Sequence, residues 1–256
     1  MNPTIDLNWF EIPEYTAIVV LGAAAGLLAA YLFLRTRSLR ASAPPTFLDA
    51  ALVTFGVGWI GARAYHVATH WEYYAARPEE IAQVGLGGLG IRGAFVLALV
   101  ALVIYAAIRK ISFWYFADAA AIGLAVGQAI GWVGALIQGA NYGVVSDGPI
   151  AMDLPDLYGL VQPRFPLQSA EIAFFVLLFI GLLYFAAQRP RSGALFVVYL
   201  GLASTANFAL GFQRGDDTAW VGLLRIDQVV DAVFIVLAAG LGLWRRIGVG
   251  DKGNVG

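Results

Sequence analysis

Seven long apolar runs dominate this sequence, and each is long enough to cross a lipid bilayer as a helix. About 20 apolar residues in a helix span the hydrocarbon core of a bilayer. The runs are continuous and do not alternate apolar with polar side chains, so they do not fit a membrane β-barrel. The sequence therefore predicts an all-α membrane protein, a seven-transmembrane helical bundle that forms a single domain over residues 1–256. The expected spans cover residues 16–34, 47–65, 89–108, 113–137, 167–187, 193–212 and 226–244.

Charged residues are scarce, at 13% of the chain against 60% hydrophobic residues. A soluble domain carries about 25% charged residues, so too few remain here to cover a surface in water. The formal net charge of −1 predicts no nucleic-acid partner. The chain has no cysteine and only two histidines. Disulfides and thiol catalysis are therefore excluded, and we expect neither a metal site nor a cofactor.

The basic residues indicate which way the bundle faces. Ten of the 16 follow the first, third, fifth and seventh spans, which the positive-inside rule places in the cytoplasm. We therefore expect the N-terminus outside and the C-terminus inside. The outer side then carries an amphipathic interfacial segment over residues 71–86 and a periplasmic loop over residues 141–164. The ten are Arg35, Arg37, Arg40, Arg109, Lys110, Arg189, Arg191, Arg245, Arg246 and Lys252.

Arg63 lies near the outer end of the second span, on one helix face with His66 and His70. A charge at membrane depth costs roughly 2.5–3.5 kcal/mol on insertion scales, so it needs a physical reason. One interpretation is a cationic face for a lipid phosphate, with a histidine that moves a proton. The alternative is a helix end whose long side chain reaches into the interface.

Arg92 lies in the glycine-rich stretch over residues 87–94, where an outer loop leads into the third span. Glycines let a backbone or ligand approach closely, and an arginine can hold a phosphodiester with paired donors. The alternative is a salt bridge to an outer-loop carboxylate. We expect Arg92 and Arg214 to converge on one outer cavity.

The fourth span carries both polar and small residues. Asp118 lies near its cytoplasmic start, where we expect a capping or pairing role. Gly127, Gly131 and Gly134 have the spacing of helix-packing glycines. Gln128 is an amide within the span and serves either packing or a ligand.

A second group of charges follows at the outer ends of the later spans. Glu171 lies one turn inside the fifth span, where a carboxylate needs a cationic partner. Asp227 and Asp231 open the seventh span, and we expect them to pair with Arg214 and Arg225.

Together, in this order, these pieces resemble prolipoprotein diacylglyceryl transferase. The similarity covers about residues 15–244 and rests on residues 61–63, 87–88, 117–119, 127–131, 163–171 and 214–228. The resemblance implies an enzyme of the bacterial inner (plasma) membrane. Such an enzyme transfers diacylglyceryl from phosphatidylglycerol, or another anionic phospholipid, to the lipobox cysteine of a prolipoprotein and releases glycerol phosphate.

Site residues follow from the matching positions and from the charges that this chemistry needs. The catalytic residues are expected to be Arg92, Arg214 and Glu171, with His66 as the proton acceptor. The phospholipid-binding residues are expected to be Tyr15, Arg63, Gly88, Gly93, Gln128, Arg164 and Gln228.

The chain departs from the family pattern at two places. The family usually has His-Gly-Gly or Tyr-Gly-Gly where residues 92–94 read Arg-Gly-Ala. Its signature Gly-Arg-Ile-Gly-Asn-Phe-Ile-Asn-Gly-Glu reads Gly-Trp-Val-Gly-Ala-Leu-Ile-Gln-Gly-Ala over residues 131–140. The alternative is therefore a catalytically impaired paralogue that serves as a lipid-binding or structural subunit of a membrane complex. A transporter is the least supported interpretation, because the sequence shows no inverted repeat.

Overall fold

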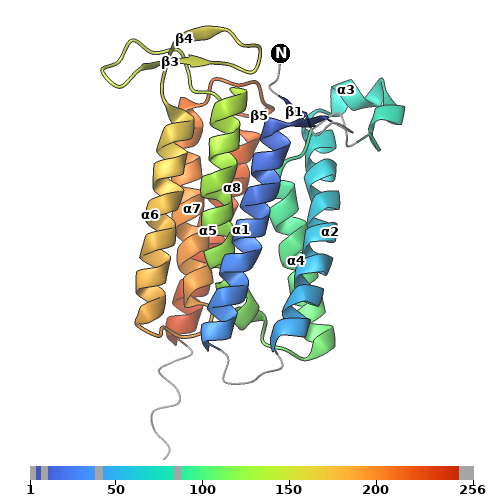
Figure 1. The fold of residues 1–256 in the computed structure, drawn as a ribbon, viewed down its shortest axis with the longest axis vertical. Helices are drawn as coiled ribbons and strands as arrows, with labels where there is room; N and C mark the ends of the chain where they lie inside the picture. The colour runs from blue at the N-terminus through green and yellow to red at the C-terminus, as the bar shows by residue number, and fades with distance from the viewer. Residues whose placement is uncertain (1–3, 7–10, 38–42, 84–87, 248–256) are drawn as a thin grey trace, which may run out of the picture. The chain divides into compact units, whose positions relative to one another are not determined.

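The computed structural model describes residues 4–6, 11–37, 43–83 and 88–247 (Figure 1). Its helices are α1 (Glu14–Arg37), α2 (Ala43–Thr69), α3 (Trp71–Ala75), η1 (Pro78–Glu80), α4 (Ile91–Arg109), α5 (Phe113–Gln138), α6 (Leu167–Ala187), α7 (Ala194–Leu210), η3 (Gly211–Gln213) and α8 (Ile226–Ile247). Its strands are β1 (Thr4–Asp6), β2 (Glu11–Pro13), β3 (Met152–Pro155), β4 (Val161–Arg164), β5 (Trp220–Val221) and β6 (Leu224–Arg225).

Seven helices in the described part of the chain are long and apolar enough to cross a membrane: α1, α2, α4, α5, α6, α7 and α8. Each contains most of one predicted span, so the predicted seven-span helical membrane protein is confirmed. Several helices extend beyond the predicted spans, as α2 does by beginning at Ala43. The direction in which the chain crosses stays a prediction, and two of the residues behind it, Arg40 and Lys252, lie outside the described residues.

Internal contacts divide the chain into two compact units. The first unit comprises Met1–Phe33, Ala117–Asp217 and Asp231–Gly256, and the second comprises Leu34–Phe116 and Thr218–Val230. The single membrane domain expected from the sequence stays a prediction.

In the first unit α1 and α5 approach each other at glycines. A Cβ on Gly26 would lie 2.6 Å from the main-chain oxygen of Gly123, and a Cβ on Gly22 would lie 2.9 Å from that of Gly127. Only residues without a side chain permit this approach. The predicted packing role is thus confirmed at Gly127, whereas a Cβ on Gly131 would meet nothing within 4 Å.

Asp118 caps a neighbouring helix in the same unit. Its Oδ2 accepts a 2.6 Å hydrogen bond from the N–H of Gly193, and its Oδ1 accepts a 3.0 Å bond from the N–H of Phe196. These N–H groups belong to the first turn of α7, which has no helical acceptor for them. The capping role expected of Asp118 is confirmed.

In the second unit α2 and α4 lie side by side (Figure 1). They approach most closely at Gly61 and Gly93, where a Cβ on either residue would collide with the main-chain oxygen of the other. The N–H of Gly90 also donates to the carbonyl of Ala62 at 2.9 Å. Helix packing therefore accounts for the glycine at position 93, and its expected lipid contact stays a prediction.

The loop expected over residues 141–164 contains a hairpin at the end where α6 begins (Figure 1). Strands β3 and β4 pair antiparallel, and the Oδ1 of Asp156 accepts hydrogen bonds from the N–H groups of Tyr158 and Leu160. The prolines in both strands hide this hairpin from sequence reasoning, because proline normally argues against a strand. The interfacial segment expected over residues 71–86 contains α3 and η1, and its residues 84–86 lie outside the described residues.

Candidate functional site

Arg63 holds the chain segment that leads into α4. Its Nε donates to the carbonyl of Ile81 at 2.8 Å, its Nη1 to that of Gly88 at 3.1 Å and its Nη2 to that of Glu80 at 2.6 Å. The side chain is buried within the second unit. These bonds satisfy much of the charged group and bring its positive charge to Glu80, Ile81 and Gly88. Sequence reasoning missed this role because the acceptors are main-chain atoms.

Glycine is the one residue type that fits position 88. Its φ of +77° is a conformation that side chains rarely adopt. A Cβ there would also lie 2.5 Å from Nε2 of His66 and 2.8 Å from Nη1 of Arg63. The structure thus brings together three predicted site residues: Arg63, His66 and Gly88.

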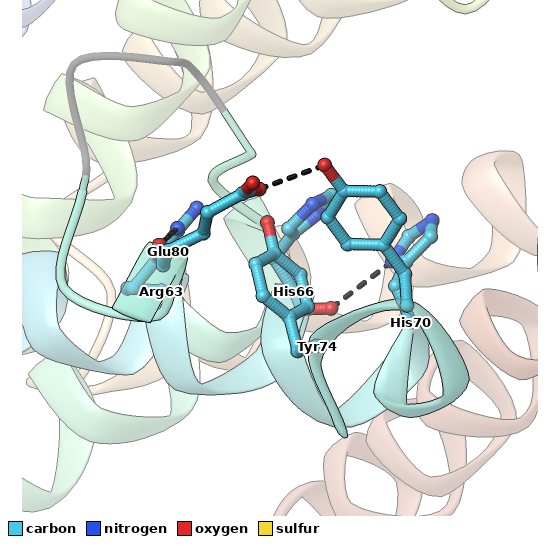
Figure 2. A pocket seen from close by; sticks show the side chains of 6 residues that line it. Arg63, His66, His70, Tyr74 and Glu80 are labelled. Carbon is cyan, nitrogen blue, oxygen red and sulfur yellow. Dashed lines mark hydrogen bonds between the residues drawn. The ribbon is translucent and has the colours of Figure 1, made fainter. Parts of the chain in front are cut away.

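A polar cavity of about 300 Å³ opens beside these residues (Figure 2). The rings of His66 and His70 stack inside it, with centroids 4.2 Å apart. The hydroxyl of Tyr73 donates to Oε2 of Glu80 at 2.7 Å, and this hydrogen bond raises the pKa of Tyr73. The cavity is lined by Arg63, His66, His70, Tyr73, Tyr74 and Glu80.

An apolar groove of about 570 Å³ in the same unit shares Arg63 with the polar cavity. Trp59, Ile60, Val67 and Trp71 line it, and three of these four are exposed. The polar cavity, which holds both Arg63 and Glu80, and the apolar groove thus meet at one arginine.

Arg92 forms an ion pair that joins α4 to the first turn of α8, both within the second unit. Its Nη1 lies 3.2 Å from Oδ2 of Asp227, in the first turn of α8. The Oδ1 of Asp227 accepts a 2.7 Å hydrogen bond from the hydroxyl of Tyr65 in α2. The sequence interpretation considered a salt bridge for Arg92 but placed its partner in an outer loop, and it paired Asp227 with other arginines.

Arg225 and Gln228 shape the start of α8. The Oε1 of Gln228 accepts a 3.0 Å hydrogen bond from the N–H of Arg225, and the guanidinium of Arg225 lies 5.7 Å from the ring centroid of Trp220. Both side chains are almost fully buried. Gln228 thus caps the helix by bonding to the main chain, and its expected lipid contact stays a prediction.

In the first unit Arg164 is 4% exposed and forms a buried ion pair. Its Nη2 lies 3.0 Å from Oδ2 of Asp156, and its guanidinium carbon lies 4.6 Å from the ring centroid of Tyr142. Burial, together with the charge of Asp156, raises the pKa of Tyr142. The Nε of Arg164 is buried and has no hydrogen-bond partner among the described residues.

Arg214 is balanced by a carboxylate two residues away. Its Nε and Nη2 contact the two oxygens of Asp216 at 2.9 and 2.5 Å, and Nη2 also donates to Oδ1 of Asn141 at 2.8 Å. Gly143 forms a bridge with Arg214, and Val145 forms one with Arg164. The main chain over residues 143–145 therefore brings Arg164 and Arg214 to one end of this unit.

Glu171 and Gln168 lie on one face at the start of α6, and both are almost fully buried. The Nε2 of Gln168 donates to the carbonyl of Ala140 at 3.1 Å, while its Oε1 is buried without a hydrogen-bond partner among the described residues. Sequence reasoning singled out Glu171 and used Gln168 only for the resemblance.

Gln128 and Tyr15 lie within the helices of the first unit. The hydroxyl of Tyr199, almost fully buried, donates to Oε1 of Gln128 at 3.1 Å, so this amide joins α5 to α7. Tyr15 in the first turn of α1 packs where a Cβ on Gly134 would lie 3.3 Å from its ring. These contacts are structural, and the expected lipid contacts of both residues stay predictions.

The predicted site residues thus fall into two groups. Arg63, His66, Gly88, Arg92, Gly93 and Gln228 belong to the second unit, and Tyr15, Gln128, Arg164, Glu171 and Arg214 belong to the first. The convergence expected of Arg92 and Arg214 stays a prediction, because they belong to different units. Among the described residues, no group of three histidines or carboxylates is placed to hold a metal ion.

Comparisons with known proteins match nearly the whole chain. The model of the family "Prolipoprotein diacylglyceryl transferase" matches residues 3–244. Three relatives are named phosphatidylglycerol–prolipoprotein diacylglyceryl transferase. The Bacillus licheniformis protein is 33% identical, covering 96% of this chain and 93% of its own. The Geobacillus kaustophilus protein is 34% identical (94% and 91%), and the Listeria innocua protein is 32% identical (95% and 87%).

Proposed function

The chain belongs to the prolipoprotein diacylglyceryl transferase family, and on that premise we propose that it transfers diacylglyceryl from phosphatidylglycerol to the lipobox cysteine of a prolipoprotein. The described helices make it a multi-pass membrane protein. The proposal places it in the plasma membrane of a bacterium, with its site toward the outer leaflet.

The observation that carries the donor half of this proposal is the position of Arg63. It lines both the polar cavity and the apolar groove of the second unit. An anionic phospholipid would place its headgroup in the cavity, beside His66 and the positive charge of Arg63, and an acyl chain in the groove. The groove would position the chain rather than supply hydrophobic free energy, because the chain already lies in hydrocarbon within the bilayer.

The reaction is a direct displacement without a covalent intermediate. Its catalysis therefore depends on stabilising the negative charge that develops on the leaving phosphate. The thiol sulfur attacks a glycerol carbon, the bond from that carbon to the phosphate oxygen breaks, and glycerol phosphate leaves with the electron pair. Cations placed at the leaving phosphate lower the barrier to this step. We propose Arg92 and Arg214 as cations of this kind, and each pairs with an aspartate of its own unit, Asp227 or Asp216.

A second candidate function is that of a lipid-binding or structural subunit without catalysis. One observation favours it: Arg92, Arg164 and Arg214 are each balanced by an aspartate of the chain itself. In an anion-binding site the arginines more often have no carboxylate partner of the protein, so that they can pair with the ligand. This alternative predicts lipid binding without transfer and a partner within a membrane complex.

Complementation of a transferase-depleted bacterium separates the two functions. The chain is expressed in the depleted strain beside the Bacillus licheniformis relative and an Arg214→Ala variant, and membrane levels are matched by immunoblot. We expect growth from the wild-type chain and none from the variant. Failure of the wild-type chain at a matched membrane level, with growth from the relative, would overturn the proposed activity in favour of the subunit.

A further inference from the structure

We propose that Asp227 is the general base that takes the proton from the acceptor thiol, held for this task by Arg92 and Tyr65. This inference rests on the proposed function and deepens it, since the transfer needs a proton acceptor at the incoming sulfur.

The geometry places three chemically different groups together at the ends of three spans. Oδ2 of Asp227 lies 3.2 Å from Nη1 of Arg92, and Oδ1 accepts the hydroxyl hydrogen of Tyr65 at 2.7 Å. All three residues belong to the second unit. Each carboxylate oxygen has a different donor, so the carboxylate is fixed in orientation.

The supporting residues are themselves held in place. A Cβ on Gly90 would collide with the ring of Tyr65, and a Cβ on Gly93 would collide with the Cβ of Tyr65. The tyrosine is thus packed against the start of α4, the helix that also carries Arg92. A proton acceptor works best when its neighbours fix its position before the substrate arrives.

The exposure of the pair, like that of Arg214 with Asp216 at 14% and 19%, lies between those of the other ion pairs. The side chains of Arg92 and Asp227 are each 13% exposed, which leaves them mostly dry and still reachable. The pair of Arg164 with Asp156 is more deeply buried, at 5% and 8%. The pair of Arg109 with Asp49 is more than half exposed, with a 4.0 Å separation.

The step then balances. Asp227 takes the thiol proton as the sulfur–carbon bond forms and the carbon–oxygen bond to the phosphate breaks. The proton passes from Asp227 to the released glycerol phosphate, and the carboxylate returns to its ionised state.

The test compares Asp227→Asn with wild type on two acceptor peptides. One peptide carries a lipobox cysteine, and the other carries selenocysteine, whose selenol ionises at neutral pH without a base. With the cysteine peptide we expect kcat to fall about 10²- to 10⁴-fold and KM for phosphatidylglycerol to stay within a few-fold. With the selenocysteine peptide we expect most of the lost rate to return.

The outcomes are distinguishable. Asp153→Asn, at an exposed position of β3, is the matched control and should keep wild-type rates with both peptides. If Asp227→Asn transfers to cysteine at the wild-type rate, or is equally slow with both peptides, Asp227 is not the base. If the wild-type chain transfers to neither peptide, the proposed function itself fails. Tyr65→Phe, which removes one hydroxyl, gives a smaller loss with the same selenocysteine recovery and covers the case in which Asp227→Asn does not fold.

Discussion

The main-chain N–H of Gly193 donates a 2.6 Å hydrogen bond to Oδ2 of Asp118, so that a side chain of α5 closes the first turn of α7. Asp118→Ala leaves two N–H groups of that turn without their acceptor. We expect the free energy of unfolding to fall by about 1–3 kcal/mol. Thermal unfolding in detergent measures it, with Asp118→Asn as the milder variant that keeps one acceptor. A melting temperature unchanged in Asp118→Ala would show that the cap contributes nothing.

Because α2 and α4 are in close contact, the effect of a glycine substitution in α2 on stability should depend on its position. Gly61→Val forces a side chain into the main-chain oxygen of Gly93, and overpacking of this kind costs about 1–3 kcal/mol. Gly56→Ala in the same helix is the matched control, because a Cβ there would meet nothing within 4 Å. We expect Gly56→Ala to be neutral or slightly stabilising. Equal effects of the two substitutions on thermal unfolding would contradict the close approach.

Substitutions of the buried pair Arg164 and Asp156 are expected to have non-additive effects on the stability of the hairpin. Arg164→Ala leaves the carboxylate buried without its cation, which costs about 3–5 kcal/mol. We expect faster amide hydrogen exchange in β3 and β4. Replacing both residues, Arg164→Met with Asp156→Asn, removes both charges, keeps an acceptor for the N–H groups of Tyr158 and Leu160, and should restore most of the protection. Exchange in the single variant that matches wild type would mean that the pair does not hold the hairpin.

Substitution of Arg214 is expected to reduce activity rather than to unfold the protein. Its guanidinium contacts both oxygens of Asp216, the geometry that a phosphate also offers. We expect Arg214→Ala to abolish transfer of labelled lipid to a lipobox peptide. Arg214→Lys keeps the charge without the paired donors, and we expect at least a tenfold loss of kcat/KM. Unchanged turnover in Arg214→Ala would remove Arg214 from the site.

The spans could be predicted from the sequence because bilayer thickness sets the length of an apolar run, and little else is needed. The cap at Asp118 was also predictable, since a carboxylate near a span end has few other uses. The hairpin over residues 152–164 was not, because its strands are short and contain prolines. The partners of the arginines are harder still to predict from the sequence. Arg63 binds main-chain carbonyls, and Arg92 pairs with Asp227 of a helix far away in the sequence.

A dual-label assay examines the proposed chemistry itself. The purified chain is given phosphatidylglycerol labelled separately in its acyl chains and its headgroup glycerol, together with a lipobox peptide. The proposed function predicts that the acyl label appears on the peptide while an equal amount of headgroup label appears as glycerol phosphate. No label on the peptide, or peptide labelling without release of glycerol phosphate, would contradict it.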